Sequence, residues 1–260
     1  MTERLLLLMP PSQSKAVGGR RSNKKGMFDD VLRVPRHEVL NAAQSFLTTA
    51  TAKELTTTFN ARGPLQERAM AAVRDFENGK VPLLPAWRRY EGVVWTHLDP
   101  SSLEPAQRRA VLILSAFYGL LSCEDPIADY RLKMNASLAP LGTLAQFWRP
   151  TLTPLLEERS RNRTIVSFLP QEHAASIDFS TLSRSREIIH VHFVAADESR
   201  AVGHDAKAVK GVLARRLLDE GGDVFHSFEW QGWRARRQDN DVYVSAPQRG
   251  AALPVCPPSS

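Results

Sequence analysis

Runs of apolar residues, either continuous or alternating with polar ones, predict where the strands of this 260-residue chain lie. Apolar runs at 4–9 and 164–170 end at prolines, so both are expected to be short buried strands. Residues 187–194 alternate between apolar and polar positions, which is typical of a strand with one buried face. A further strand is expected at Gly-Val-Val-Trp, residues 92–95, and a closing hairpin is expected with its turn at 238–241.

Apolar residues spaced three and four apart predict helices between these strands. The pattern favours helices over 35–51, over 63–79 with a stop at Gly79, and over 146–158, entered through Pro150. Another helix is expected to begin at Ser101 or Ser102, and the apolar run 110–121 that follows is expected to be core. A further helical pattern lies within 202–222 and is closed by the Gly-Gly pair at its end.

Strands interleaved with helices indicate a mixed α/β (α+β) protein, with a mixed sheet flanked by helices. The chain shows no internal repeat and no linker-like break, so residues 1–247 are expected to form a single domain. Residues 248–260 are rich in proline and small side chains, and we expect a disordered tail there.

The composition excludes several classes of protein. Two cysteines, Cys123 and Cys256, supply neither a disulfide framework nor a zinc motif. No apolar run reaches the roughly 18–20 residues of a membrane helix, and the N-terminus lacks the features of a signal peptide. A cytoplasmic protein that contacts no membrane is therefore expected.

The chain has a net charge of +6 and a pI near 9.6. A basic surface favours a phosphate-bearing partner, either nucleic acid or a nucleotide. The arginines are scattered in short pairs, however, so a base composition that favours arginine codons explains the charge equally well.

A polar loop follows the first predicted strand and carries Ser12, Ser14 and Lys15. Ligands of open α/β sheets gather at the carboxyl ends of strands, so these side chains could hold a phosphate or a carboxylate. The loop is not a P-loop, because its glycines follow the lysine. The alternative is an ordinary solvent-exposed loop.

The predicted helix within 202–222 carries Lys207 and Lys210 in its opening turns, where the helix dipole is already positive. An anion bound at this end would explain both lysines, and Gly211 would let a ligand or another backbone approach closely. His204 lies at or beside the cap. The alternative is that both lysines reach out to water and Gly211 serves packing alone.

Histidines provide two further candidates. His190 and His192 share one strand face and could chelate a metal, but no third ligand is evident, so a solvated strand face is favoured and no metal is expected. Glu172 and His173 follow a predicted strand and could form an acid–base pair, since a carboxylate raises the pKa of a neighbouring imidazole.

Three motifs together resemble the bacterial YaaA family of peroxide stress proteins. The first is the strand and loop Leu7-Leu8-Met9-Pro10-Pro11-Ser12-Gln13-Ser14-Lys15, followed by Gly18-Gly19. The second and most specific is Leu114-Ser115 with Tyr118-Gly119-Leu120-Leu121, Asp125-Pro126-Ile127, Tyr130-Arg131-Leu132 and Met134, followed by Gln146-Phe147-Trp148. The third is Lys207 with Lys210-Gly211, and Gly232-Trp233 matches a further family pair.

This resemblance implies a compact α/β fold with a basic cleft and a link to protection from oxidative damage. It also implies a similarity to DNA-binding proteins that contain a helix-hairpin-helix. On this reading nucleic acid or a phosphate-bearing ligand binds in the cleft, and no cofactor is expected. The lining residues would be Lys15, Arg131, Lys207 and Lys210, with Tyr118, Tyr130 or Trp148 available to stack on bases.

The chain departs from the family pattern at Leu169-Pro170-Gln171-Glu172-His173. The family has a small residue, Ser, Asp or Asn, Glu and Tyr at this place, so Glu172 is kept and His173 replaces a tyrosine. The change alters acid–base capacity. It leaves open an enzyme that acts on a nucleoside, a nucleotide or a related small molecule, with Glu172 or Asp125 as base and His173 or His204 as acid.

Overall fold

The computed structural model describes residues 5–76, 80–195 and 203–247, and it has the mixed α/β architecture expected from the sequence. One sheet contains eight strands in the order β10-β11-β12-β9-β8-β1-β3-β4. Their bounds are β1 Leu5–Met9, β3 Val111–Ser115, β4 Gly119–Ser122, β8 Thr164–Ser167, β9 Ile188–Val194, β10 Glu229–Trp230, β11 Trp233–Gln238 and β12 Asp241–Ser245. Two short pairs stand apart: β2 Leu84–Pro85 with β5 Pro126–Ile127, and β6 Ser137–Leu138 with β7 Gly142–Thr143.

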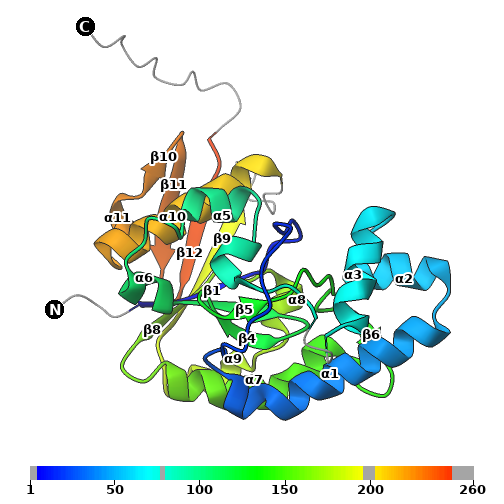
Figure 1. The fold of residues 1–260 in the computed structure, drawn as a ribbon. Helices are drawn as coiled ribbons and strands as arrows, with labels where there is room; N and C mark the ends of the chain where they lie inside the picture. The colour runs from blue at the N-terminus through cyan, green and yellow to red at the C-terminus, as the bar shows by residue number, and fades with distance from the viewer. Residues whose placement is uncertain (1–4, 77–79, 196–202, 248–260) are drawn as a thin grey trace, which may run out of the picture.

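The helices pack around this sheet. Their bounds are α1 Asp29–Thr49, α2 Ala52–Phe59, α3 Pro64–Arg74, α4 Ala86–Arg89, α5 Val93–Leu98, α6 Pro105–Arg109, α7 Leu144–Arg159, α8 Gln171–Ala174, α9 Phe179–Leu182, α10 His204–Glu220 and α11 Val224–Ser227. Figure 1 shows α10 and α5 lying together over the upper part of the sheet, α7 and α1 running below it, and α2 and α3 standing out to one side. Among the described helices, none is both long and apolar enough to span a membrane.

The strand β1 lies in the interior of the sheet and pairs in parallel with β3 on one side and β8 on the other. Every residue of β1 is buried. A strand covered on both faces needs an unbroken apolar run, which explains why Leu5–Met9 is not alternating. The predicted strands at 4–9, 164–170 and 187–194 and the closing hairpin are confirmed.

Two predictions near the middle of the chain are wrong. Residues 92–95 are not a strand: Val93 begins the helix α5, which packs against α10. The β-branched valines favour a strand locally, but packing against α10 decides the outcome. The helix expected from Ser101 or Ser102 is the short α6, which begins at Pro105.

The apolar run 110–121 is core, as expected, and it forms the antiparallel pair β3–β4. Gly119 makes the tight turn possible, since its φ of +70° is costly for other residues and a Cβ atom there would lie 2.8 Å from the Trp148 ring.

The helices α1, α3 and α7 differ from their predicted bounds. The helix α1 begins at Asp29, before the predicted start at Pro35, because Asp29 and Asp30 favour its positive N-terminal end. The helix α3 ends at Arg74, and the predicted stop at Gly79 lies outside the described residues. The disordered tail predicted for residues 248–260 also lies outside them. The helix α7 spans Leu144–Arg159 and contains Pro150.

Candidate functional site

A cavity of about 150 Å³ lies at the carboxyl ends of β1 and β8. From β1 the chain leads to β3 on one side of the sheet, and from β8 it leads to β9 on the other, so the two connections diverge here. Such a switch point is where open α/β sheets bind ligands. We call it the switch-point cavity. It is lined by Pro10, Pro11, Ser12, Gln13, Lys15, Phe59, Asn60, Tyr130, Arg131, Leu132, Lys133, Pro170, Glu172 and His173.

Lys15 is the most unusual residue of this cavity, because its side chain is charged at neutral pH in most proteins yet only 7% exposed here. Its Nζ donates a hydrogen bond to the carbonyl oxygen of Ser12 at 2.8 Å and lies 4.5 Å from the centre of the Tyr130 ring. Burial lowers the pKa of Lys15 to about 7, and the positive charges of Arg131 and Arg89 act in the same direction.

Arg131 adds a second cation to the same wall. It donates to the carbonyl oxygen of Gln13, and its Nη2 lies 3.5 Å from Oδ1 of Asp129. Asp129 also lies 3.5 Å from Arg68, so this carboxylate is shared between two guanidinium groups. The cavity wall therefore has an excess of positive charge.

Glu172 and His173 come from the short helix α8 and both line the cavity. Burial and, to a smaller extent, the charge of Lys210 lower the pKa of His173 to about 4. The imidazole is therefore neutral at neutral pH. Its Nδ1 lies 3.6 Å from Oε1 of Glu172, too far for a hydrogen bond. The expected acid–base pair thus consists of a half-exposed carboxylate beside a neutral ring.

The residues of α10 separate into different roles. Lys210 Nζ donates to the carbonyl oxygen of Phe168 at 2.9 Å, directly after β8. Lys207 and His204 are exposed, and neither lines a described cavity.

Gly211 lies where α10 crosses α5. A Cβ atom at this position would lie 2.4 Å from the carbonyl oxygen of Val94, so the glycine allows close helix packing. At Gly211 the sequence left open the close approach of a ligand or of another backbone. In the structure it is the backbone of α5 that approaches.

The aromatic residues expected to stack on bases belong to the core. Trp148 is fully buried and its Nε1 donates to the carbonyl oxygen of Ala116 at 2.8 Å. Tyr118 Oη accepts from the backbone of Ala128 at 2.9 Å. Neither ring offers a free face, because the packing that holds β3 and β4 covers both. Stacking by Trp148 and Tyr118 is therefore excluded in this arrangement.

Tyr130 is also buried, but it lines the switch-point cavity. Its hydroxyl accepts a hydrogen bond from Ser115 Oγ at 2.7 Å and lies 2.7 Å from the hydroxyl of Tyr90. Burial raises the pKa of Tyr130 to about 12, so the hydroxyl stays protonated. Ser115 thus acts through Tyr130 and does not line the cavity itself.

Asp125 lies away from the cavity. Its carboxylate accepts from the backbone amides of Met27 at 2.8 Å and Ser122 at 3.0 Å, while burial raises its pKa. It fixes the loop before α1, so the structure gives Asp125 a structural role in place of the expected catalytic one.

The candidate metal site at His190 and His192 lacks further ligands. The described residues contain no group of three or more His, Cys, Asp or Glu side chains that could hold a metal ion. His192 Nε2 lies 2.6 Å from Asp241 Oδ1, and its ring stacks on Tyr243. His192 is exposed, whereas His190 is partly buried.

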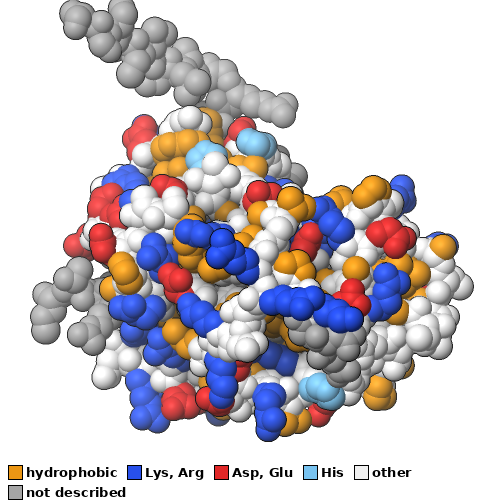
Figure 2. Space-filling view, viewed as in Figure 1, with side chains coloured by type: hydrophobic (Ala, Val, Ile, Leu, Met, Phe, Trp, Pro, Cys, Tyr) orange, Lys and Arg blue, Asp and Glu red, His pale blue; other side chains and the backbone are white. Residues whose placement is uncertain are grey.

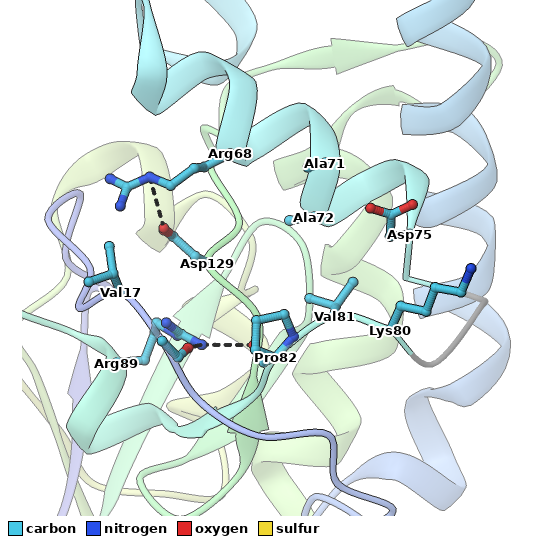
Figure 3. Close-up of a pocket in the computed structure, with 11 residues that line it drawn as sticks. Val17, Arg68, Ala71, Ala72, Asp75, Lys80, Val81, Pro82, Arg89 and Asp129 are labelled. Carbon is cyan, nitrogen blue, oxygen red and sulfur yellow. Dashed lines mark hydrogen bonds and ion pairs between the residues drawn. The ribbon is translucent and has the colours of Figure 1, made fainter.

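A second cavity, about 200 Å³ in volume, lies between α3 and residues 80–82 and was not expected from the sequence (Figure 3). Arg89 lines it and is fully buried, with its guanidinium donating to four backbone carbonyl oxygens: Ala16, Gly18, Pro82 and Ile127. In the sequence, Arg89 belongs to one of several Arg-Arg pairs. Three of the four carbonyl oxygens that accept its hydrogen bonds come from residues more than 30 positions away along the chain. Nothing local marks it as buried.

The comparisons with known proteins agree with the family that the three motifs indicate. A family model described as "Peroxide stress protein YaaA" matches residues 5–238. UPF0246 protein SCO2297 of Streptomyces coelicolor is 26% identical over 227 residues, which cover 84% of each chain. A UPF0246 protein of Caulobacter vibrioides is 29% identical over 184 residues, 68% of each chain. The match spans nearly the whole sheet, and the chain belongs to the YaaA family of peroxide stress proteins.

Proposed function

We propose that this protein binds a small phosphate-bearing ligand in the switch-point cavity. The observation that carries the proposal is the burial of Lys15 beside Arg131 in the wall of a cavity. Among the described residues, no carboxylate forms an ion pair with Lys15 within 4.0 Å, and the charge of Asp129 acts on its amine only from a greater distance. Burying a cation without a counter-ion in contact is costly, and a bound anion would offset that cost.

Nucleic acid offers the same phosphate chemistry on a larger scale. Figure 2 shows Lys and Arg side chains spread across the middle and lower part of one face, with Asp and Glu between them. A nucleic-acid backbone could bind to this face, and protection of DNA under oxidative stress would then be the cellular role. The small volume of the cavity and the burial of Tyr118 and Trp148 favour the small ligand, because neither aromatic ring is free to stack on a base.

A chemical step in the cavity is a second candidate function. Its support is the meeting of Lys15, Glu172 and His173 in one small space. An amine with a pKa of about 7 can take up or release a proton at physiological pH, as a general base or acid must. Glu172→Gln should then abolish turnover of a phosphorylated substrate without lowering the melting temperature.

Calorimetric titration tests the binding. Ribose 5-phosphate and inorganic phosphate are titrated into the wild-type protein, into Lys15→Met and into Lys53→Met. Lys53 is exposed on α2, so its variant is a control with the same loss of charge. We expect Lys15→Met to weaken binding at least about tenfold and Lys53→Met to leave it unchanged. Absence of binding to either anion would contradict the proposal.

A short DNA duplex provides the second arm of the test. Its affinity is measured at about 50 mM and about 200 mM salt, since binding through phosphates weakens steeply over this range. One result would contradict binding in the switch-point cavity: an affinity for DNA that falls steeply with salt and is the same in Lys15→Met, together with no binding of the small anions. The ligand would then be nucleic acid bound to the outer basic face.

A further inference from the structure

The second cavity, which we call the α3 cavity, has apolar walls and charged side chains at both ends, with Asp75 and Lys80 at the end opposite Arg68 and Asp129. Figure 3 shows Arg68 and Asp129 pointing toward each other at one end of it, with Arg89 below them turned toward Pro82. The apolar wall residues are Val17, Ala71, Ala72, Val81 and Pro82. Its volume of about 200 Å³ is below the roughly 300–1,000 Å³ typical of sites for drug-sized ligands, so it suits one ring system.

Arg68 and Asp129 form an ion pair at one end of the α3 cavity, but the two nearest atoms of this pair make no hydrogen bond. Arg68 Nε and Asp129 Oδ2 lie 3.5 Å apart, and both atoms are buried without a hydrogen bond to any described residue. Buried polar atoms are nearly always hydrogen-bonded, so unsatisfied ones call for a partner. Arg89 in the same wall is different, because four carbonyl oxygens already accept its protons.

The α3 cavity and the switch-point cavity share a wall. Asp129 lines the first and Arg131 lines the second, and these two side chains lie 3.5 Å apart. The loop after β1 also serves both cavities, with Lys15 in one and Val17 two residues later in the other. The two cavities are therefore neighbours on either side of the Asp129–Arg131 pair, and a ligand with parts in both would have to pass this pair.

We propose that the α3 cavity holds a planar nitrogen heterocycle of the same ligand whose phosphate lies against Lys15 and Arg131. This inference rests on the proposed function and narrows its ligand to nucleotide-like molecules. The apolar walls cover the faces of the ring. At its edge an N–H group donates to Asp129 Oδ2, and a neighbouring carbonyl oxygen or ring nitrogen accepts from Arg68 Nε. Every nucleobase carries such a neighbouring donor and acceptor.

The test compares ligands with and without a ring. Uridine and guanosine 5′-monophosphate are titrated calorimetrically beside ribose 5-phosphate, which has the phosphate and sugar alone. We expect at least one nucleotide to bind at least about tenfold more tightly than ribose 5-phosphate. Equal affinity for all three would overturn the inference and leave the proposed function standing, whereas binding of none would remove both.

Two variants locate the ring. Ala71→Leu extends a half-buried side chain of α3 into the cavity, and Ala52→Leu makes the same change at an exposed position of α2. Ala71→Leu should bring the affinity for the nucleotide down to that of ribose 5-phosphate, and Ala52→Leu should not.

Asp129→Asn keeps the size of the side chain and removes the negative charge. It should reduce the preference for the nucleotide at least about fivefold, provided that the melting temperature confirms folding. A preference that survives both Ala71→Leu and Asp129→Asn would place the ring elsewhere and overturn the inference.

Discussion

Replacement of Lys15 by methionine should stabilise the protein in acid. Methionine keeps the unbranched chain and its packing while it removes the amine. In the wild-type protein, burial and the charges of Arg131 and Arg89 lower the pKa of Lys15 from 10.5 to about 7. The difference, 10.5 − 7 = 3.5, corresponds to a folding cost of about 5 kcal/mol below pH 7, at about 1.36 kcal/mol for each pKa unit.

This cost already includes the contacts of the ammonium group with the carbonyl oxygen of Ser12 and with the Tyr130 ring, because a pKa shift reports the net difference between the charged and the neutral form. Lys15→Met also loses the hydrogen bond that the neutral amine can donate to Ser12, which contributes about 1 kcal/mol. The net expectation near pH 6 is a free energy of unfolding about 4 kcal/mol higher for Lys15→Met than for the wild-type protein.

The difference should depend on pH in a known direction. Between about pH 7 and pH 10.5 the unfolded wild-type chain binds the Lys15 proton and the folded protein does not, so wild-type stability rises with pH. Lys15→Met lacks this contribution. The gap between the two proteins should therefore shrink by about 2–3 kcal/mol from pH 6 to pH 9.

Urea denaturation followed by circular dichroism at about pH 6, 7.5 and 9 measures this gap, with Lys53→Met as the exposed control. The control should track the wild-type protein at every pH. A gap between Lys15→Met and wild type that does not change with pH would refute the reasoning, because it would mean that Lys15 titrates alike in the folded and unfolded states.

Three other outcomes follow from the same contacts. Affinity for inorganic phosphate, measured by calorimetry, should fall as the pH rises from about 7 to 9, by up to tenfold per unit, because Lys15 loses its charge; a constant affinity would argue against it. Arg89→Lys should lower the free energy of unfolding by about 2–4 kcal/mol in urea, since lysine cannot serve four carbonyl oxygens; a loss below about 1 kcal/mol would contradict this. Gly211→Ala should cost about 1–2 kcal/mol in the same assay, because the clash with Val94 outweighs the better helix propensity, and a gain in stability would show that α5 moves aside.

The strands of the sheet could be predicted because their patterns are set by burial. Leu5–Met9 is covered on both faces, and residues 187–194 have one buried face, so the apolar run and the alternation follow directly. The segment 92–95 could not be predicted in this way. Its two valines favour a strand, and only the packing of α5 against Gly211 of α10 makes it a helix.

The candidate site was predictable where strand ends carry it. Ser12, Lys15, Glu172 and His173 follow β1 or β8, and parallel neighbours bring their carboxyl ends together. The family motifs predicted the cavity lining less well. Trp148 belongs to one of these motifs and was expected to stack on a base, but its side chain is buried in the core.

The α3 cavity had no local signature. Arg68 and Arg89 are separated along the chain from Asp129, and their meeting depends on how α3 packs beside residues 80–82. A sequence pattern cannot report such a meeting, because each arginine looks like an ordinary surface residue.

The central claim is that a phosphate group lies against the buried amine of Lys15. Nuclear magnetic resonance of protein labelled with ¹³C at the lysine Cε follows this amine directly, and Lys15→Met identifies its signal. The account predicts a pKa of about 7 for Lys15 in the free protein. Saturating ribose 5-phosphate should raise this pKa by at least about one unit, because the anion favours the charged form. A pKa near that of an exposed lysine, or one that ribose 5-phosphate leaves unchanged, would contradict the account.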